Sequence, residues 1–228
     1  MINAIDSFKI LPSDITAIIL TYNEEMHIER CILNIKDIVK RIVVIDSFST
    51  DNTLSLLKKY NIEVLQKEFI NFSEKFNWGL KNANIKTNWV LRLDADEVVT
   101  KVLAKEIVEN LKNYPTNISA ISINRTLIFL GKNISFGGVF PHRTTRIWKN
   151  GKGKMQNLLI DEDMIIDGDV ISIKENIVDH KLNSFNFWIK KHKKVCIIEA
   201  INFFLEKDKV YTIKESTRIF LEKKNLKK

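Results

Sequence analysis

The sequence predicts an α/β fold in which a Rossmann-like mixed sheet is flanked by helices and followed by a basic helical tail. In the first half, short β-branched apolar runs alternate with segments whose apolar residues recur at helical spacing. This alternation is typical of parallel βαβ units. After Pro115 the pattern changes to short strands and a Gly-rich loop, and the chain beyond Lys181 is largely helical and rich in lysine.

Each element of the first half is predicted from its own run of residues. Strands are expected at residues 15–20, 41–45, 62–65 and 89–93. The first helix is indicated by apolar residues on one face, at Ile28, Ile32, Ile35 and Val39. The segment Ser49-Thr50-Asp51 offers capping side chains for a second helix, and residues 74–84 form the third.

The second half is predicted to add a helix, three strands and two loops before the tail. The helix covers residues 102–111. The strands are expected at residues 120–123, 125–130 and 144–148. A Gly-rich loop spans residues 131–141, an acidic loop spans residues 161–169, and the tail opens with a long helix at residues 184–204.

A chain of 228 residues with 45% apolar content is long enough for one α/β domain with a substantial core. We expect a core of residues 1–180 and a helical extension of residues 181–228. The sequence shows no apolar run near the roughly 18 residues of a membrane-spanning helix, and its start lacks the pattern of a secretory signal. A cytoplasmic protein is expected, with Cys31 and Cys196 as buried free thiols.

The net charge of +8 lies wholly in the tail. Residues 181–228 hold thirteen basic and five acidic side chains, whereas residues 1–180 hold twenty-three of each. One interpretation is a solvated helical face. The other is attraction to an anionic membrane surface or a phosphorylated glycolipid, worth on the order of 1 kcal/mol for each basic residue near the surface. The sequence shows no recognised nucleic-acid-binding motif, so nucleic acid is not an expected partner.

Polar residues directly follow three of the predicted parallel strands. These clusters are residues 21–24, Asp46-Ser47 and Asp94-Ala95-Asp96. Ligands of open α/β sheets bind beyond the carboxyl ends of the strands. We therefore expect the three clusters to converge on one crevice.

Asp94 and Asp96 form the sharpest local signal. Two closely spaced carboxylates at a strand end suit a hard divalent cation whose shell is completed by phosphate oxygens. An ordinary acidic turn would have the same sequence. The first strand is not followed by a GxGxxG or Walker loop, which argues against a dinucleotide dehydrogenase or a P-loop enzyme. A site without such a phosphate cradle needs a cation, which these carboxylates could hold.

Four segments in order resemble the signatures of family 2 glycosyltransferases with a GT-A fold. Three are similar to the nucleotide-binding signatures of the family: ITAIILTYNE at 15–24, RIVVIDSFSTDNT at 41–53 and WVLRLDADE at 89–97. The fourth, GKNISFGGVFPHRTTRIWKNG at 131–151, is similar to a stretch of the lipopolysaccharide core glucosyltransferase branch. The similarity runs from about residue 15 to residue 200.

The resemblance implies a donor-binding set that comprises Thr21, Tyr22, Glu24, Asp46, Lys75, Asn77 and Asp94. The first three would border the uridine, and Asp46 would accept a hydrogen bond from the uracil ring. Lys75 and Asn77 would lie beside the nucleotide, and Asp94 would contact ribose or metal. From the residues alone, Lys75 would point to solvent and Asn77 would make a hydrogen bond on a helix face.

Further roles are implied for the cation, the acceptor and the base. Asp96 and His180 would bind Mg²⁺ or Mn²⁺, although a lone His is as often a surface or capping residue. Gly137 and Gly138 would let the acceptor approach closely, or else mark a turn. Glu162 would be the general base.

The segment around Glu162 leaves two points open. Asp161 stands where the branch carries a His, which puts any role of that His in doubt. Asp163 is an alternative base, and a surface acidic loop without catalytic function is a further interpretation.

The implied activity is metal-dependent transfer of a hexose, with inversion, from a UDP-sugar to a lipopolysaccharide or lipooligosaccharide inner-core acceptor. Glucose is the hexose expected from the branch, and the reaction would take place at the cytoplasmic face of the inner membrane. A transferase for another glycolipid or capsule precursor is one alternative. A non-catalytic nucleotide-sugar-binding module is another. No obligate protein partner is implied.

Overall fold

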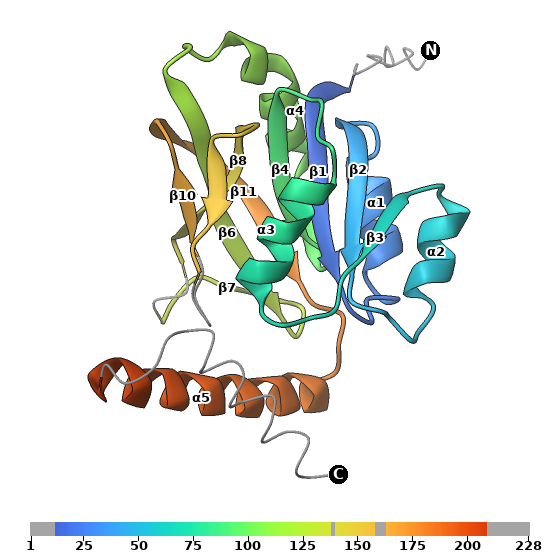
Figure 1. The fold of residues 1–228 in the computed structure, drawn as a ribbon, viewed down its shortest axis with the longest axis vertical. Coiled ribbons are helices and arrows are strands. Elements are labelled where there is room, and N and C mark those ends of the chain that lie inside the picture. The colour runs from blue at the N-terminus through green and yellow to red at the C-terminus, as the bar shows by residue number, and fades with distance from the viewer. Residues whose placement is uncertain (1–11, 138–139, 158–162, 209–228) are drawn as a thin grey trace, which may run out of the picture.

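The computed structural model describes residues 12–137, 140–157 and 163–208 (Figure 1). Four strands of its main sheet are parallel neighbours in the order β3-β2-β1-β4. They are β1 (Ser13–Thr21), β2 (Val39–Asp46), β3 (Glu63–Gln66) and β4 (Trp89–Asp94). This half is the series of βαβ units that the sequence predicts.

The sheet continues as β4-β8-β6-β11-β5, with antiparallel steps at β4-β8, β8-β6 and β11-β5. These strands are β5 (Glu97–Val99), β6 (Ile118–Phe129), β8 (His142–Lys149) and β11 (Asp169–His180). β7 (Lys132–Ile134) pairs with β6, while β9 (Gly153–Met155) and β10 (Met164–Ile166) form a small separate sheet. The prediction of a mixed α/β sheet is confirmed.

Helices cover both faces of the sheet. One core packs α1 (Ile28–Ile35), α2 (Thr53–Lys59) and α4 (Lys101–Asn110) against the sheet, and the 3₁₀ helix η1 (Leu111–Asn113) follows α4. The opposite core packs α3 (Phe72–Asn82) and the small sheet. Alternate residues of β1 enter the two cores, Ala17 and Ile19 into the first and Ile18 into the second.

The long helix α5 (Phe185–Asp208) crosses the end of the sheet at which β11 ends (Figure 1). Aromatic rings fasten it there, since the ring centroid of Phe129 lies 6.3 Å from that of Phe185 and 5.1 Å from that of Trp188. In the described residues, none of the helices is both long and apolar enough to cross a bilayer.

Several element predictions need correction. Val39 begins β2 instead of ending α1, because the chain turns directly after Ile35. The two strands expected at 120–123 and 125–130 are one strand, β6. Part of the acidic loop forms β10, and the sequence did not predict β11, much of which is only partly buried. Both cysteines are free thiols as expected, but Cys196 is exposed and only Cys31 is buried.

Candidate functional site

The carboxyl ends of β1, β2 and β4 lie side by side, as predicted. In the parallel ladders Thr21 is the register partner of Asp46, and Leu20 is the partner of Asp94. The residues that follow these strands therefore lie at the same end of the sheet. α5 crosses this end (Figure 1), which is where ligands of open α/β sheets bind.

The loops after β1 and β2 are locked together by hydrogen bonds between side chains and backbone. The backbone N–H of Asn23 donates to Ser49 Oγ at 2.9 Å, and the N–H of Thr50 donates to Asn23 Oδ1 at 2.8 Å. Asn23 and Phe48 have φ angles of 57° and 56°, in the left-handed region. Such strained residues persist where their surroundings fix them, which is common at binding sites.

The carboxylate of Asp46 accepts hydrogen bonds from both ends of this pair of loops. Its carboxylate accepts hydrogen bonds from Thr21 Oγ1 at 2.8 Å, from the Ser49 N–H at 2.8 Å and from Ser49 Oγ at 2.5 Å. The side chain is fully buried. The structure thus gives Asp46 and Thr21 a scaffolding contact, and their predicted contacts with uridine stay predictions.

Lys75 and Asn77 of α3 are also engaged by the protein itself. Lys75 is buried and its Nζ donates to the carbonyl of Thr21 at 2.7 Å, so the expectation from the residues alone that it would point to solvent is wrong. Burial lowers the pKa of Lys75 to about 8. Asn77 exchanges two hydrogen bonds with the backbone of Met155, at 3.0 and 2.9 Å. Both side chains therefore make structural contacts with the backbone near the strand ends.

Tyr22 and Glu24 are the more accessible members of the donor set. Tyr22 is 59% exposed, and Glu24 is partly exposed. Glu24 Oε2 lies 2.7 Å from Nδ1 of the buried His27, whose Nε2 accepts the N–H of Leu182 at 2.9 Å. Because a backbone N–H can only donate, Nδ1 carries the proton and donates to Glu24. His27 thus links the first loop to the segment before α5.

Asp94 belongs to a charge cluster with the buried Glu97 and with two arginines. Arg146 Nη2 donates to Glu97 Oε1 and lies 3.5 Å from Asp94 Oδ2, while Arg92 Nη2 lies 3.8 Å from the same oxygen. Glu97 and Arg146 are each only 1% exposed. Burial raises the pKa of Asp94, but Arg92 and Arg146 outweigh this effect and hold it below its ordinary value.

Asp96 and His180 lie side by side where β11 ends next to the start of β5. The His180 N–H donates to the carbonyl of Asp96 at 3.0 Å, so the two predicted metal ligands are neighbours. Asp96 Oδ2 lies 3.1 Å from Lys181 Nζ. A carboxylate oxygen is a ligand that Mg²⁺ and Mn²⁺ accept, but here the oxygen is paired with an ammonium group. The role of Asp96 as a metal ligand stays a prediction.

His180 does not fit ligation in the arrangement observed. Its Nδ1 lies 3.3 Å from Arg30 Nη1, and a guanidinium can only donate. The imidazole proton then lies on Nε2, which has no lone pair for a metal ion. Burial lowers the pKa of His180, and Arg30 lowers it further, which favours this neutral form. Among the described residues no three His, Cys, Asp or Glu side chains form a metal-binding group, so phosphate oxygens would have to complete the shell.

The acceptor and base predictions fall largely outside the described residues. Gly138 and Glu162 lie in segments that the structure does not describe. Gly137 has a φ of 77°, and an added Cβ would meet no atom of the described chain within 4 Å. The backbone angle therefore favours glycine there. Asp163 is exposed, and its Oδ1 accepts the N–H of Met164 at 2.8 Å.

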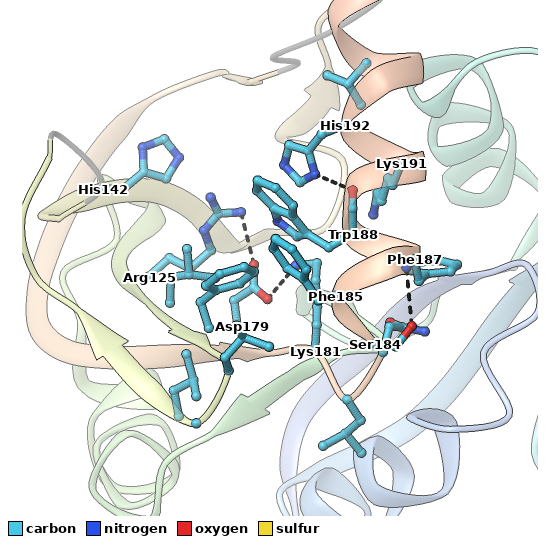
Figure 2. A pocket seen from close by; sticks show the side chains of 18 of the residues that line it. Arg125, His142, Asp179, Lys181, Ser184, Phe185, Phe187, Trp188, Lys191 and His192 are labelled. Carbon is cyan, nitrogen blue, oxygen red and sulfur yellow. Dashed lines mark hydrogen bonds and ion pairs between the residues drawn. The ribbon is translucent and has the colours of Figure 1, made fainter.

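A cavity of about 830 Å³ lies between the sheet and α5. Figure 2 shows Arg125 and Lys181 directed at Asp179, with Phe185 and Trp188 of α5 beside them. Arg146 also lines the cavity, and its Nε and Nη1 are buried without a hydrogen-bond partner in the described chain. Buried donors that lack partners beside a cavity suit an anionic ligand.

The sequence interpretation missed the charged side chains that surround the two aspartates. Lys181 directly follows His180, and Glu97 directly follows Asp96. Their position next to predicted metal ligands could have indicated that they belong to the site. Arg92 lies between two apolar residues of a strand, and Arg146 is followed by the apolar pair Ile147 and Trp148. A charge in such a segment is rarely buried without a partner. That pattern could have indicated a buried charge cluster.

Known proteins support the fold and the family. The crystal structure of residues 1–349 of S. aureus TarS in complex with UDP aligns with 73% of this chain and 60% of that chain, with a TM-score of 0.53 and 21% identity. This similarity confirms the GT-A-like fold.

Relatives in sequence match parts of longer proteins. An uncharacterized glycosyltransferase of Rickettsia bellii is 33% identical over 99 residues, which are 43% of this chain and 33% of that protein. The lipopolysaccharide core biosynthesis glycosyltransferase LpsC of Rhizobium meliloti is 25% identical over 162 residues, 68% of this chain and 58% of that protein. The chain thus spans about a third of the length of the Rickettsia relative. The glycosyl transferase family 2 model matches residues 16–178, and the protein therefore belongs to this family.

Proposed function

We propose that the protein transfers a hexose from a UDP-sugar to a lipopolysaccharide or lipooligosaccharide inner-core acceptor, with inversion at the anomeric carbon. The observation that carries the proposal is the position of Asp94 and Asp96 beside a cation-lined cavity at the carboxyl end of a parallel sheet. Family membership supports the reaction class. The similarity to LpsC supports the acceptor class, and glucose is the hexose expected from this branch.

The donor is proposed to lie across the strand ends with its uridine beside Tyr22 and Glu24. The exposed ring of Tyr22 offers a surface for the base, and the interlocked loops beneath it form a rigid support. The diphosphate would then face Asp94, Asp96 and the unpartnered donors of Arg146. These charges suit an anion accompanied by a cation.

A Mg²⁺ or Mn²⁺ ion would be held by Asp96, with His180 as a second ligand only after its proton moves from Nε2 to Nδ1. When bound, such an ion neutralises charge on the leaving diphosphate. Arg146 adds fixed positive charge next to the same region. This arrangement places stabilising charge where negative charge develops in the transition state.

The acceptor is proposed to enter the cavity between the sheet and α5, with its hydroxyl near Glu162. The Glu162 carboxylate would take the hydroxyl proton while the oxygen attacks the anomeric carbon. The new glycosidic bond forms as the bond to the diphosphate oxygen breaks, and UDP leaves with that electron pair. The basic side chains of residues 181–228 support peripheral binding to an anionic membrane surface.

Substitution of Asp96 tests the function. Asp96→Asn removes a charge with little change of shape, and we expect turnover with a panel of UDP-hexoses and core acceptors to fall by at least about a hundredfold. Asp37→Asn, a matched change at an exposed acid, should leave turnover unchanged. Release of UDP would be measured with Mn²⁺ or with chelator. Full activity of Asp96→Asn in chelator would contradict the cation assignment, and UDP binding without any turnover would favour the binding-module alternative.

A pair of variants tests the base. Glu162→Gln should keep near-normal UDP-sugar affinity while turnover falls by at least about a hundredfold, because the base contacts only the acceptor hydroxyl. Asp163→Asn should remain active, since that carboxylate already accepts the N–H of Met164. Donor titration and steady-state kinetics would be compared. An inactive Asp163→Asn beside an active Glu162→Gln would transfer the role to Asp163.

A further inference from the structure

Lys181 is a cation shared between two carboxylates. Its Nζ lies 3.1 Å from Asp96 Oδ2 and 2.5 Å from Asp179 Oδ1. Asp179 has a second cationic neighbour, because Arg125 Nη1 lies 3.7 Å from its other oxygen. In the described part of the chain, Lys181 is the cation paired with Asp96. If the ammonium group moved away, Asp179 would stay compensated and Asp96 would not.

The backbone at Lys181 is fixed, whereas its side chain has space to move. The residue before it donates its N–H to Asp96, and the N–H of Leu182 after it donates to the buried His27. The Lys181 side chain lines the cavity and is 27% exposed. A lysine carries a point charge on a flexible four-carbon stem, so its head group can change partners without a change in the fold.

We propose that Lys181 is an internal counter-cation of Asp96 that makes the binding of a divalent cation depend on the donor diphosphate. The inference rests on the proposed function, in which Asp96 holds that cation. Without a donor, a divalent ion must displace the ammonium group from Asp96 and also meet the positive charge of nearby Arg30, which donates to the carbonyl of Asp96 at 3.1 Å. Asp96 alone offers too few ligands to offset this repulsion.

The diphosphate removes both obstacles together. Its oxygens complete the shell of the ion, and its negative charge gives the Lys181 ammonium group a new partner within the same cavity. Lys181 then acts as a positioning residue for the diphosphate beside the ion. Coupling of this kind is reciprocal, so the ion should tighten nucleotide binding by the same factor.

Titration of Mn²⁺ followed by electron paramagnetic resonance tests the inference without any turnover. In the wild type, saturating UDP should tighten Mn²⁺ binding by at least about tenfold. Lys181→Met removes the internal cation, so this variant should bind Mn²⁺ at least about tenfold tighter than the wild type when UDP is absent, a difference of about 1.4 kcal/mol. UDP should then tighten its Mn²⁺ binding less. The matched control Lys191→Met removes a lysine from the α5 wall of the same cavity and should behave as the wild type.

The controls separate this inference from the proposed function. Equal Mn²⁺ affinities of wild type and Lys181→Met without UDP would overturn the inference alone, provided that their melting temperatures agree. Should Lys181→Met not fold, Lys181→Arg serves instead. It keeps the charge and should match the wild type without UDP, and tighter Mn²⁺ binding by this variant would overturn the inference. Failure of the wild type to bind Mn²⁺ even with UDP would overturn the cation assignment of the proposed function and the inference with it.

Discussion

The two sides of the candidate site are held together by different kinds of interaction. On the donor side, the loops after β1 and β2 are joined by hydrogen bonds among Asn23, Asp46 and Ser49 and their backbone groups. On the cavity side, at the ends of β4, β5, β6, β8 and β11, carboxylates form ion pairs with cations. The members of this charge cluster are Asp94, Asp96, Glu97, Asp179, Arg92, Arg125, Arg146 and Lys181.

The difference indicates which side is preorganised and which can rearrange. Short polar side chains that bond to nearby backbone have few alternative partners, so the donor loops keep one shape. Ion pairs are less specific, because Asp94 is shared by two arginines and Lys181 is shared by two carboxylates. A charged ligand can compete for these partners. The donor side thus suits recognition of a neutral base, and the cavity side suits exchange of charge with a diphosphate and a cation.

Removal of Arg146 should have the largest effect on stability. Arg146→Met takes the cation from Glu97, which is 1% exposed, and from Asp94. Breaking one partner out of a buried pair typically costs about 3–5 kcal/mol, because the remaining charge must stay uncompensated or take up a proton. Urea unfolding would measure the loss. On the donor side, Ser49→Ala should cost only about 1–2 kcal/mol, since it removes neutral and singly charged hydrogen bonds.

Two further variants test whether an uncompensated charge causes the loss of stability in Arg146→Met. Adding Glu97→Gln to Arg146→Met removes the stranded carboxylate and should recover part of the lost stability. Arg41→Met breaks the exposed pair with Glu63 and should cost less than about 1 kcal/mol. A loss at Arg146 no larger than that at Arg41 would remove the distinction between the two sides.

The fold could be predicted where the spacing of apolar residues indicates which positions of a strand or helix are buried. β1 and β4 are short apolar runs within the sheet, and their positions were found to within a few residues. β11 was missed because much of it is only partly buried and its residues are mostly polar. Its pairing with β6 depends on contacts between segments far apart in the sequence, which no local pattern reveals.

The candidate site could be predicted only in part for a similar reason. Asp94 and Asp96 could be identified from their spacing at the end of a predicted strand. Their partners Arg146 and Lys181 come from strands and turns that follow much later, so the charge balance of the site appears only in three dimensions. Lys75 was identified as a basic residue of the site, but its contact with the Thr21 carbonyl depends on how α3 packs against β1.

The pH-dependent effect on stability concerns Lys75, the buried cation of the donor side. Burial lowers its pKa from 10.5 to about 8 in the folded protein, whereas the unfolded chain keeps the ordinary value. Below about pH 8 both states hold the proton, and the folded state bears the full cost of a buried charge. Between pH 8 and pH 10.5 the unfolded chain binds more protons, so the contribution of Lys75 to stability rises with pH.

The comparison is sharpened by measuring this pH dependence against a variant without the amine. Urea unfolding of the wild type and of Lys75→Met at pH 7.5, 9 and 10.5 isolates the contribution of Lys75, because all other groups are shared. The wild type should gain up to about 3 kcal/mol relative to the variant across this window. A difference that does not change with pH would mean that Lys75 keeps its charge in the folded state. The carboxylates of Asp46 and Glu24 would then offset the cost of burying the Lys75 charge completely. The donor side would compensate its buried cation as fully as the cavity side does, and this contrast between the two sides would no longer stand.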